Sequence, residues 1–183
     1  MRSERTELDQ SKAWCSSPVD CSPGPEDHRP RLADVLRPLA TKRNDPTLGE
    51  LLITGILGWV ECNCVGIRLF LSDGTLAYNT HIGFSKKFWL AENLISTKCD
   101  QCACTRVVLG HPEPQDFAAM TPGGSFCTPR LVEFAASLTA EELARFRGRC
   151  IEEGFQSLAI IPIPHAGQVI GALHLAPAQT PWM

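Results

Sequence analysis

Two apolar runs near the C-terminal end of the sequence restrict the fold more than any other feature. The runs FQSLAIIPIP (155–164) and QVIGALHLA (168–176) each have the length of a strand, and only HAG separates them. A tight connection between two strand-length runs predicts a β-hairpin. A second hairpin is predicted where the turn SDG joins CVGIRLFL to TLAYNTHIG. The chain is therefore expected to build an antiparallel sheet.

Three segments carry helix signals. In TLGELLITGILGW (47–59), Thr47 and Glu50 have capping-box spacing, and in LTAEELARFRGRCIEEG (138–154) Thr139 and Glu142 have the same spacing. Between them, FSKKFWLAENLIS (84–96) is predicted as a helix with Ser85 as its cap. The expected buried faces are Leu48, Leu51, Leu52, Ile56 and Trp59 in the first helix, and Leu143, Phe146, Cys150 and Ile151 in the last.

The order of these elements predicts an α+β fold, with one antiparallel sheet of about five or six strands and helices packed on it. Residues 1–45 are rich in Pro, Ser and charged side chains, and we expect a disordered N-terminal lead. The folded domain is expected over 46–178, followed by a short tail at 179–183. Glycine and proline interrupt the stretch from 97 to 130, which is predicted to be irregular.

Charge and hydropathy exclude several classes of partner. A net charge of -3 and a pI of about 5.9 give no field that would attract nucleic acid. The sequence contains neither a membrane-length apolar run nor a secretory signal, so a membrane partner is not expected and a cytoplasmic location is. The 9 cysteines are therefore expected to be reduced thiols rather than a disulfide framework.

The element order, together with GFQSLAIIPIPHAGQVIGALHLA after a helix, resembles the GAF domain, a family of cytoplasmic sensory modules. The middle of the chain, with CDQCACTRVVLGHPEPQD and MTPGGSF, is similar to a variant found in bacterial sensor proteins such as histidine kinases. This resemblance implies a ligand site between the sheet and the covering helices and loops. The sequence lacks the NKxFDE pattern of cyclic-nucleotide-binding members and the Cys-His pair that attaches a bilin.

The stretch CDQCAC brings three thiols together at Cys99, Cys102 and Cys104. A zinc ion or an iron-sulfur cluster would need a fourth ligand, such as Cys127, Cys150 or His111. If residues 103–110 are helical, positions two apart point about 200° apart, and Cys102 and Cys104 cannot share an ion. Redox sensing by two neighbouring thiols and simple packing as small apolar side chains remain the alternatives.

Other candidate ligand-binding residues are Trp89, Arg106 and Asp116, for which core packing and a loop-fixing salt bridge are the structural alternatives. His81 and His174 on strands could bind haem through a ring nitrogen, although a hydrogen-bonded strand histidine is more common. Cys62, Cys64 and Cys150 are expected to be packing residues.

Two classes of function follow from these features. The first is a non-catalytic sensory domain that binds a small molecule or senses redox or metal state, in the pathway of a histidine kinase or regulator. The second is a thiol-dependent oxidoreductase of the free methionine sulfoxide reductase type, which the cysteine cluster suggests. The first amphipathic helix could also pair with its copy in a homodimer.

Overall fold

A computed structural model of the chain describes residues 48–60 and 62–177. The predicted disordered lead and the C-terminal tail lie outside these residues. The described strands form one six-stranded antiparallel sheet, which confirms the predicted single sheet of about five or six strands, and their order is β3-β2-β1-β6-β5-β4. The strands are β1 (Val65–Phe70), β2 (Thr75–Ile82), β3 (Leu94–Ser96), β4 (Phe126–Thr128), β5 (Leu158–His165) and β6 (Gln168–Leu175).

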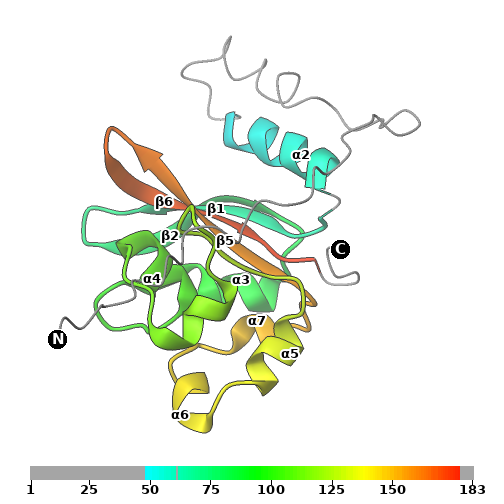
Figure 1. The fold of residues 1–183 in the computed structure, drawn as a ribbon. Helices are drawn as coiled ribbons and strands as arrows, with labels where there is room; N and C mark the ends of the chain where they lie inside the picture. Colours follow the sequence, from blue (N-terminus) through cyan, green and yellow to red (C-terminus); the bar gives the residue numbers. More distant parts are fainter. Residues whose placement is uncertain (1–47, 61, 178–183) are drawn as a thin grey trace, which may run out of the picture.

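Helices cover both faces of the sheet (Figure 1). Helix α2 lies alone on one face, and the remaining helices lie on the other. They are α2 (Leu48–Val60), α3 (Lys86–Glu92), α4 (Ala103–Leu109), the 3₁₀ helix η1 (Pro114–Ala119), α5 (Leu131–Ala136), α6 (Ala140–Leu143) and α7 (Arg149–Glu152). Among these helices, none has the length and apolar character needed to cross a bilayer.

Alternation along β1 divides the core into two layers. Val65 and Ile67 pack toward α2, whose fully buried residue is Ile53, with Leu52 and Ile56 beside it. The helical pattern in the sequence identified Leu52 and Ile56 but not Ile53. The larger layer lies between the opposite face of the sheet and α3, α4 and α7. Arg68 of β1 faces this larger layer and is fully buried, and the candidate site is built around it.

Both hairpins and two of the caps were predicted correctly. The Ser85 hydroxyl accepts a hydrogen bond from the Phe88 amide at 3.0 Å. Thr139 and Glu142 form a reciprocal capping box, with Thr139 N–H donating to the Glu142 carboxylate at 2.8 Å and Glu142 N–H donating to the Thr139 hydroxyl at 3.2 Å. These signals are local, so the sequence alone determines them.

Two helix predictions were wrong in extent. Residues 94–96 are not part of α3 but form strand β3, which pairs with β2. The unpaired backbone N–H and C=O groups at the edge of β2 are hydrogen-bonding partners for these residues. The expected single helix after Thr139 is two short helices, α6 and α7, separated at Gly148, whose φ of 73° is incompatible with a continuing right-handed helix. Leu143, expected to be buried, is consequently 37% exposed.

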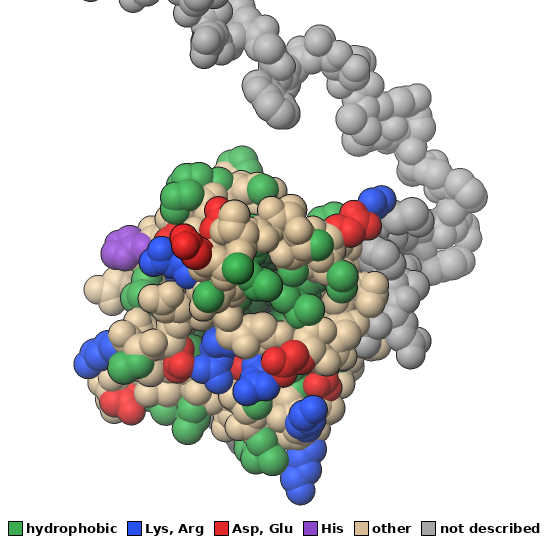
Figure 2. All heavy atoms as spheres, turned by 90° about the horizontal axis from the view of Figure 1, so that it is seen from below, with side chains coloured by type: hydrophobic (Ala, Val, Ile, Leu, Met, Phe, Trp, Pro, Cys, Tyr) green, Lys and Arg blue, Asp and Glu red, His purple; other side chains and the backbone are tan. Residues whose placement is uncertain are grey.

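Seen from below, the molecule shows acidic and basic side chains interspersed with hydrophobic ones rather than an extended area of one charge (Figure 2). Exposed ion pairs such as Arg130–Glu133 and Arg149–Glu152 account for part of this mixture. This face therefore offers no broad electrostatic attraction for a charged partner.

Candidate functional site

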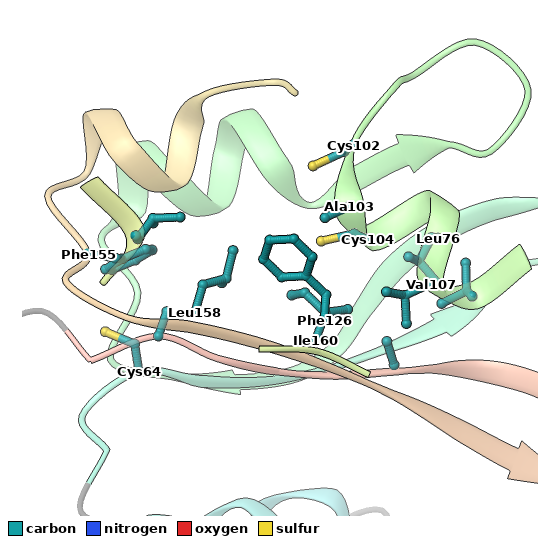
Figure 3. Packing of buried hydrophobic residues seen from close by; sticks show 14 of the residues in the cluster. Cys64, Leu76, Cys102, Ala103, Cys104, Val107, Phe126, Phe155, Leu158 and Ile160 are labelled. Carbon is teal, nitrogen blue, oxygen red and sulfur yellow. The ribbon is translucent and has the colours of Figure 1, made fainter. Parts of the chain in front are cut away.

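Two thiols lie at the start of α4, beneath the covering helices. Cys102 is the residue before the helix, with extended backbone angles of φ -161° and ψ 156°, and Cys104 lies in the first turn. Both side chains are buried, and in Figure 3 their sulfur atoms project to the same side of α4, over Phe126. The sequence-based argument against two thiols facing one place assumed that both residues were helical. Because Cys102 precedes the helix, that argument does not apply.

The two thiols act on each other electrostatically. A hydrogen bond from the Cys104 thiol lowers the pKa of Cys102 to about 6, and backbone N–H groups of Cys104 and Arg147 add to this effect, against the opposing effect of burial. The same interaction and burial raise the pKa of Cys104 well above its ordinary value of 9.0. Of the two thiols, Cys102 is therefore the one that ionises first, while Cys104 keeps its proton.

A third thiol reaches the same place from another helix. Cys150 of α7 lines, with Cys102 and Cys104, a cavity of about 30 Å³. Burial raises the pKa of Cys150 well above its ordinary value, and the charge of Cys102 adds to the increase. The other lining residues are mostly apolar, with the carboxylate of Glu92 and the backbone around Gly148 at the rim. The sequence analysis expected Cys150 to be a packing residue, with a fourth metal ligand as the alternative.

A fully buried arginine lies beside this cavity. Arg68 of β1 faces the helical layer because its neighbours Ile67 and Leu69 face α2. Its guanidinium carbon is 3.8 Å from the centroid of the Tyr78 ring, and its Nη2 is 3.8 Å from a Glu92 carboxylate oxygen. The Nε, Nη1 and Nη2 atoms have no hydrogen-bond acceptor among the residues that the structure describes. This is unusual, since buried donors are nearly always satisfied.

A hydrogen-bonded pair of rings flanks the guanidinium. The Tyr78 hydroxyl and His174 Nδ1 are 2.6 Å apart, and Gly66 makes room for the tyrosine, since a Cβ there would lie 2.5 Å from the ring. Burial, with a smaller effect of Arg68, lowers the pKa of His174 well below its ordinary value of 6.5. The histidine is therefore neutral, and no hydrogen-bond partner of its Nε2 occurs within the described residues.

Arg147 fastens the segment between α6 and α7 over the site. Its Nε donates to Glu92 at 2.8 Å, its Nη1 donates to Asp100, and its Nη2 donates to the Ala91 carbonyl at 3.0 Å. One side chain thus ties the loop before Cys102 and the end of α3 to the segment that closes the cavity.

The predicted pair Arg106 and Asp116 forms a structural clamp. Arg106 Nε and Nη2 donate to the two Asp116 oxygens at 2.6 and 2.7 Å, and Nη1 donates to the Arg145 carbonyl at 2.8 Å. This confirms the structural alternative, a salt bridge that fixes the loop after α4. Trp89, on α3, stacks on His81 at 5.8 Å, and neither residue lines the cavity.

The structure brings together only part of the predicted site. Cys102 and Cys104 line the cavity, whereas Cys99 is exposed. Cys127 packs on the α2 side of the sheet, so the sheet separates it from the other thiols. Sequence reasoning missed Arg68, although the strand alternation in VGIRLFL shows a charged residue on the face opposite to Ile67 and Leu69.

The groups proposed as cofactors do not fit this arrangement. The predicted ligand set of Cys99, Cys102, Cys104 and Cys127 is not assembled, and no group of three or more suitable side chains is placed to hold a metal ion within residues 48–60 and 62–177. Haem is far larger than the cavity of about 30 Å³, which His174 does not line, and that histidine is already hydrogen-bonded to Tyr78.

Comparison with known proteins supports the fold. No family model matches the sequence, and no curated protein does. The structure is similar to the GAF domain region of a Geobacter sulfurreducens protein (TM-score 0.53, 16% identity, covering 79% of this chain and 83% of that one). It is also similar to the GAF domain of the Acinetobacter phosphoenolpyruvate-protein phosphotransferase (TM-score 0.52, 11% identity, covering 81% and 77%).

A slighter similarity links the chain to the type II free methionine-R-sulfoxide reductase of Thermoplasma acidophilum (TM-score 0.40, 14% identity, covering 66% of this chain and 63% of that one). That degree of similarity carries no conclusion about activity. The two GAF domains each cover about four fifths of this chain. The part of the chain that the structure describes therefore has the fold of a GAF domain.

Proposed function

We propose that this chain is a non-catalytic sensory domain that binds a small ligand with oxygen acceptors next to Arg68. The observation that carries the proposal is the fully buried guanidinium, which has no hydrogen-bond acceptor among residues 48–60 and 62–177. A buried polar group without a partner costs roughly 1–3 kcal/mol, and more when it is charged. A ligand that supplies acceptors would recover this cost, and that gain in free energy is the basis for selective binding.

The guanidinium favours one ligand chemistry. Its planar array of N–H donors matches two oxygens of a carboxylate or a planar oxyanion. The Tyr78 ring covers one face, so donors remain available at the edge, near Glu92. Arg68 does not itself line the cavity, but Glu92, 3.8 Å from the guanidinium, does, and at about 30 Å³ the cavity has room for roughly two water molecules. The expected ligand is therefore a small oxyanion or carboxylate with few heavy atoms, not a nucleotide.

Binding can be tested with formate and nitrate as probes. Chemical denaturation of the full chain in either salt, against chloride at equal ionic strength, should show a ligand-dependent gain in unfolding free energy. The gain is about 2.7 kcal/mol at a ligand concentration of 100 times Kd. Calorimetric titration of the unmodified protein should give one site per chain.

The matched variants are Arg68→Met, which replaces a buried arginine, and Arg130→Met, which replaces an exposed one. Arg68→Met should lose the response to both anions, and Arg130→Met should keep it. If no anion binds the unmodified protein above the chloride control, or if Arg68→Met responds equally, the ligand proposal is wrong. The calorimetric result decides the matter even where Arg68→Met is poorly folded.

The route from the site to the rest of the molecule is short. Ile67 and Leu69, on either side of Arg68 in β1, pack into the layer that contains α2. A shift of β1 on ligand binding would therefore reach α2 directly. In the proposed function, α2 passes the change on, either to its copy in a homodimer or to a histidine kinase or regulator. A molar mass in solution that stays monomeric at all concentrations would remove the homodimer.

An oxidoreductase of the free methionine sulfoxide reductase type is the second candidate, because Cys102 and Cys104 could supply two electrons. In that reaction two thiols become a disulfide, and the sulfoxide oxygen leaves as water. We place it second because methionine sulfoxide is larger than the cavity of about 30 Å³. Thiol-dependent conversion of free methionine sulfoxide to methionine, absent in Cys102→Ser, would reverse this order.

A further inference from the structure

We propose that Cys102 and Cys104 form a disulfide on reaction with a small peroxide, and so constitute a modification site that opens onto the same cavity. The inference goes beyond ligand binding and does not depend on it. It rests on three features of the described residues. The two sulfur atoms project to the same side of α4, and the cavity that they line admits only small molecules. One of the two thiols, Cys102, has a lowered pKa, which favours the nucleophilic thiolate.

The backbone permits the bond. Residues two apart in a chain have Cα atoms at most about 7 Å apart, and a disulfide needs a Cα separation of about 4.4–6.8 Å. The two sulfur atoms project to the same side of α4, and both residues line one cavity (Figure 3). Because Cys102 has extended backbone angles before α4, closing the bond does not require two helical residues to point in one direction.

The protonation states fit the chemistry. A thiolate, not a thiol, attacks a peroxide oxygen. Cys102 is the thiolate, and Cys104 holds the proton. Attack breaks the O–O bond and gives a sulfenic acid on Cys102 and a hydroxide ion, which takes the Cys104 proton and becomes water. The Cys104 thiolate then attacks the Cys102 sulfur and expels hydroxide, which solvent protonates. Two thiols and one hydrogen peroxide thus yield one disulfide and two waters.

The cavity limits which oxidants react. Cys102 is only 9% exposed, and the space in front of it is about 30 Å³. Hydrogen peroxide is comparable in size to two water molecules, which such a space can hold. Oxidised glutathione is far larger than this space. We therefore expect peroxide to oxidise the pair at least about tenfold faster than oxidised glutathione at equal concentration.

Disulfide mapping of the reduced full chain tests the proposal. After a few equivalents of hydrogen peroxide, alkylation and peptide mass analysis should find a bond between Cys102 and Cys104. Cys104→Ser should stop at a sulfenic acid on Cys102, which dimedone captures once the protein is unfolded in denaturant, and Cys102→Ser should give neither product. Cys150→Ser, a control from the same cavity, should still form the Cys102–Cys104 bond.

Several results would overturn the inference. A disulfide between Cys102 and Cys150 would assign the resolving thiol to α7 instead. Recovery of both Cys102 and Cys104 as free thiols, while the exposed Cys99 is oxidised, would leave the pair with a packing role only. Equal rates with peroxide and oxidised glutathione would refute selection by the cavity. Mapping of the unmodified protein is decisive even where a serine variant is unstable.

Discussion

Replacement of Asp116 by alanine should destabilise the domain strongly, because it removes the acceptor of a buried ion pair. The Asp116 carboxylate accepts hydrogen bonds from Arg106 Nε at 2.6 Å, from Arg106 Nη2 at 2.7 Å and from the Glu113 amide at 3.0 Å. In the variant, the Arg106 guanidinium stays buried and keeps the Arg145 carbonyl, at 2.8 Å, the Phe146 ring, at 4.7 Å, and the longer ion pair of its Nη1 with the partly exposed Glu113 carboxylate, at 4.0 Å.

The expected loss is about 3–5 kcal/mol of unfolding free energy, the range found when one partner of a buried ion pair is removed. Urea denaturation followed by far-ultraviolet circular dichroism measures it, provided that the slope of free energy against denaturant is unchanged. The matched control is Glu133→Ala, which removes the partner of Arg130 in a pair whose side chains are each 69% exposed. That change should cost less than about 1 kcal/mol.

A double variant separates the charge from the packing. Arg106→Met with Asp116→Ala removes both charges, and it should be more stable than Asp116→Ala alone because no unpaired charge remains buried. A loss of less than about 1 kcal/mol for Asp116→Ala, or a double variant less stable than the single one, would contradict the assignment of this pair as the clamp of the loop.

Stability should fall as pH drops below 6.5, because burial lowers the pKa of His174 and the unfolded chain then binds a proton that the folded chain does not. His174→Gln should flatten this slope, which is at most about 1.4 kcal/mol per pH unit. The lowered pKa of Cys102 should likewise decrease the unfolding free energy as pH falls from 9.0 to about 6. Urea titrations of Cys102→Ser should lack this contribution. Gly83→Ala should destabilise far more than Gly167→Ala, because both have positive φ but only at Gly83 would a Cβ lie 1.7 Å from a backbone oxygen; equal thermal shifts would refute this. Arg147→Met should speed alkylation of Cys102 by iodoacetamide, since it unties the segment over the cavity, and an unchanged rate would show that other contacts close it.

The parts of the fold that sequence predicted are those that neighbouring residues determine. The turns of both hairpins and the caps at Ser85 and Thr139 depend on side chains a few positions apart. Strand β3 was missed because its pairing with β2 is not encoded in LIS itself, which suits a helix end equally well. The break at Gly148 was missed because a single glycine inside a periodic pattern does not by itself end a helix.

The candidate site shows the same division. CDQCAC drew attention to Cys102 and Cys104, since three thiols in six residues stand out in any sequence. Arg68 and Cys150 come from distant segments, and only the folded structure brings them close enough for the charge of Arg68 to act on the pKa of Cys150. Cys127 was grouped with the other thiols because spacing alone does not say on which face of a sheet a residue lies.

The pairing of β1 with β6 also determines how the domain responds to tension. Val65, where the chain enters β1, is paired with Leu175, where it leaves β6, so both attachment points lie at the same end of one antiparallel ladder. A pull between them loads the hydrogen bonds one after another rather than all at once, because these bonds run perpendicular to the strands. The ladder should open like a zipper at low force in an optical trap, even if the protein resists heat. A partner that pulls on the two ends could therefore unfold this domain with little mechanical work.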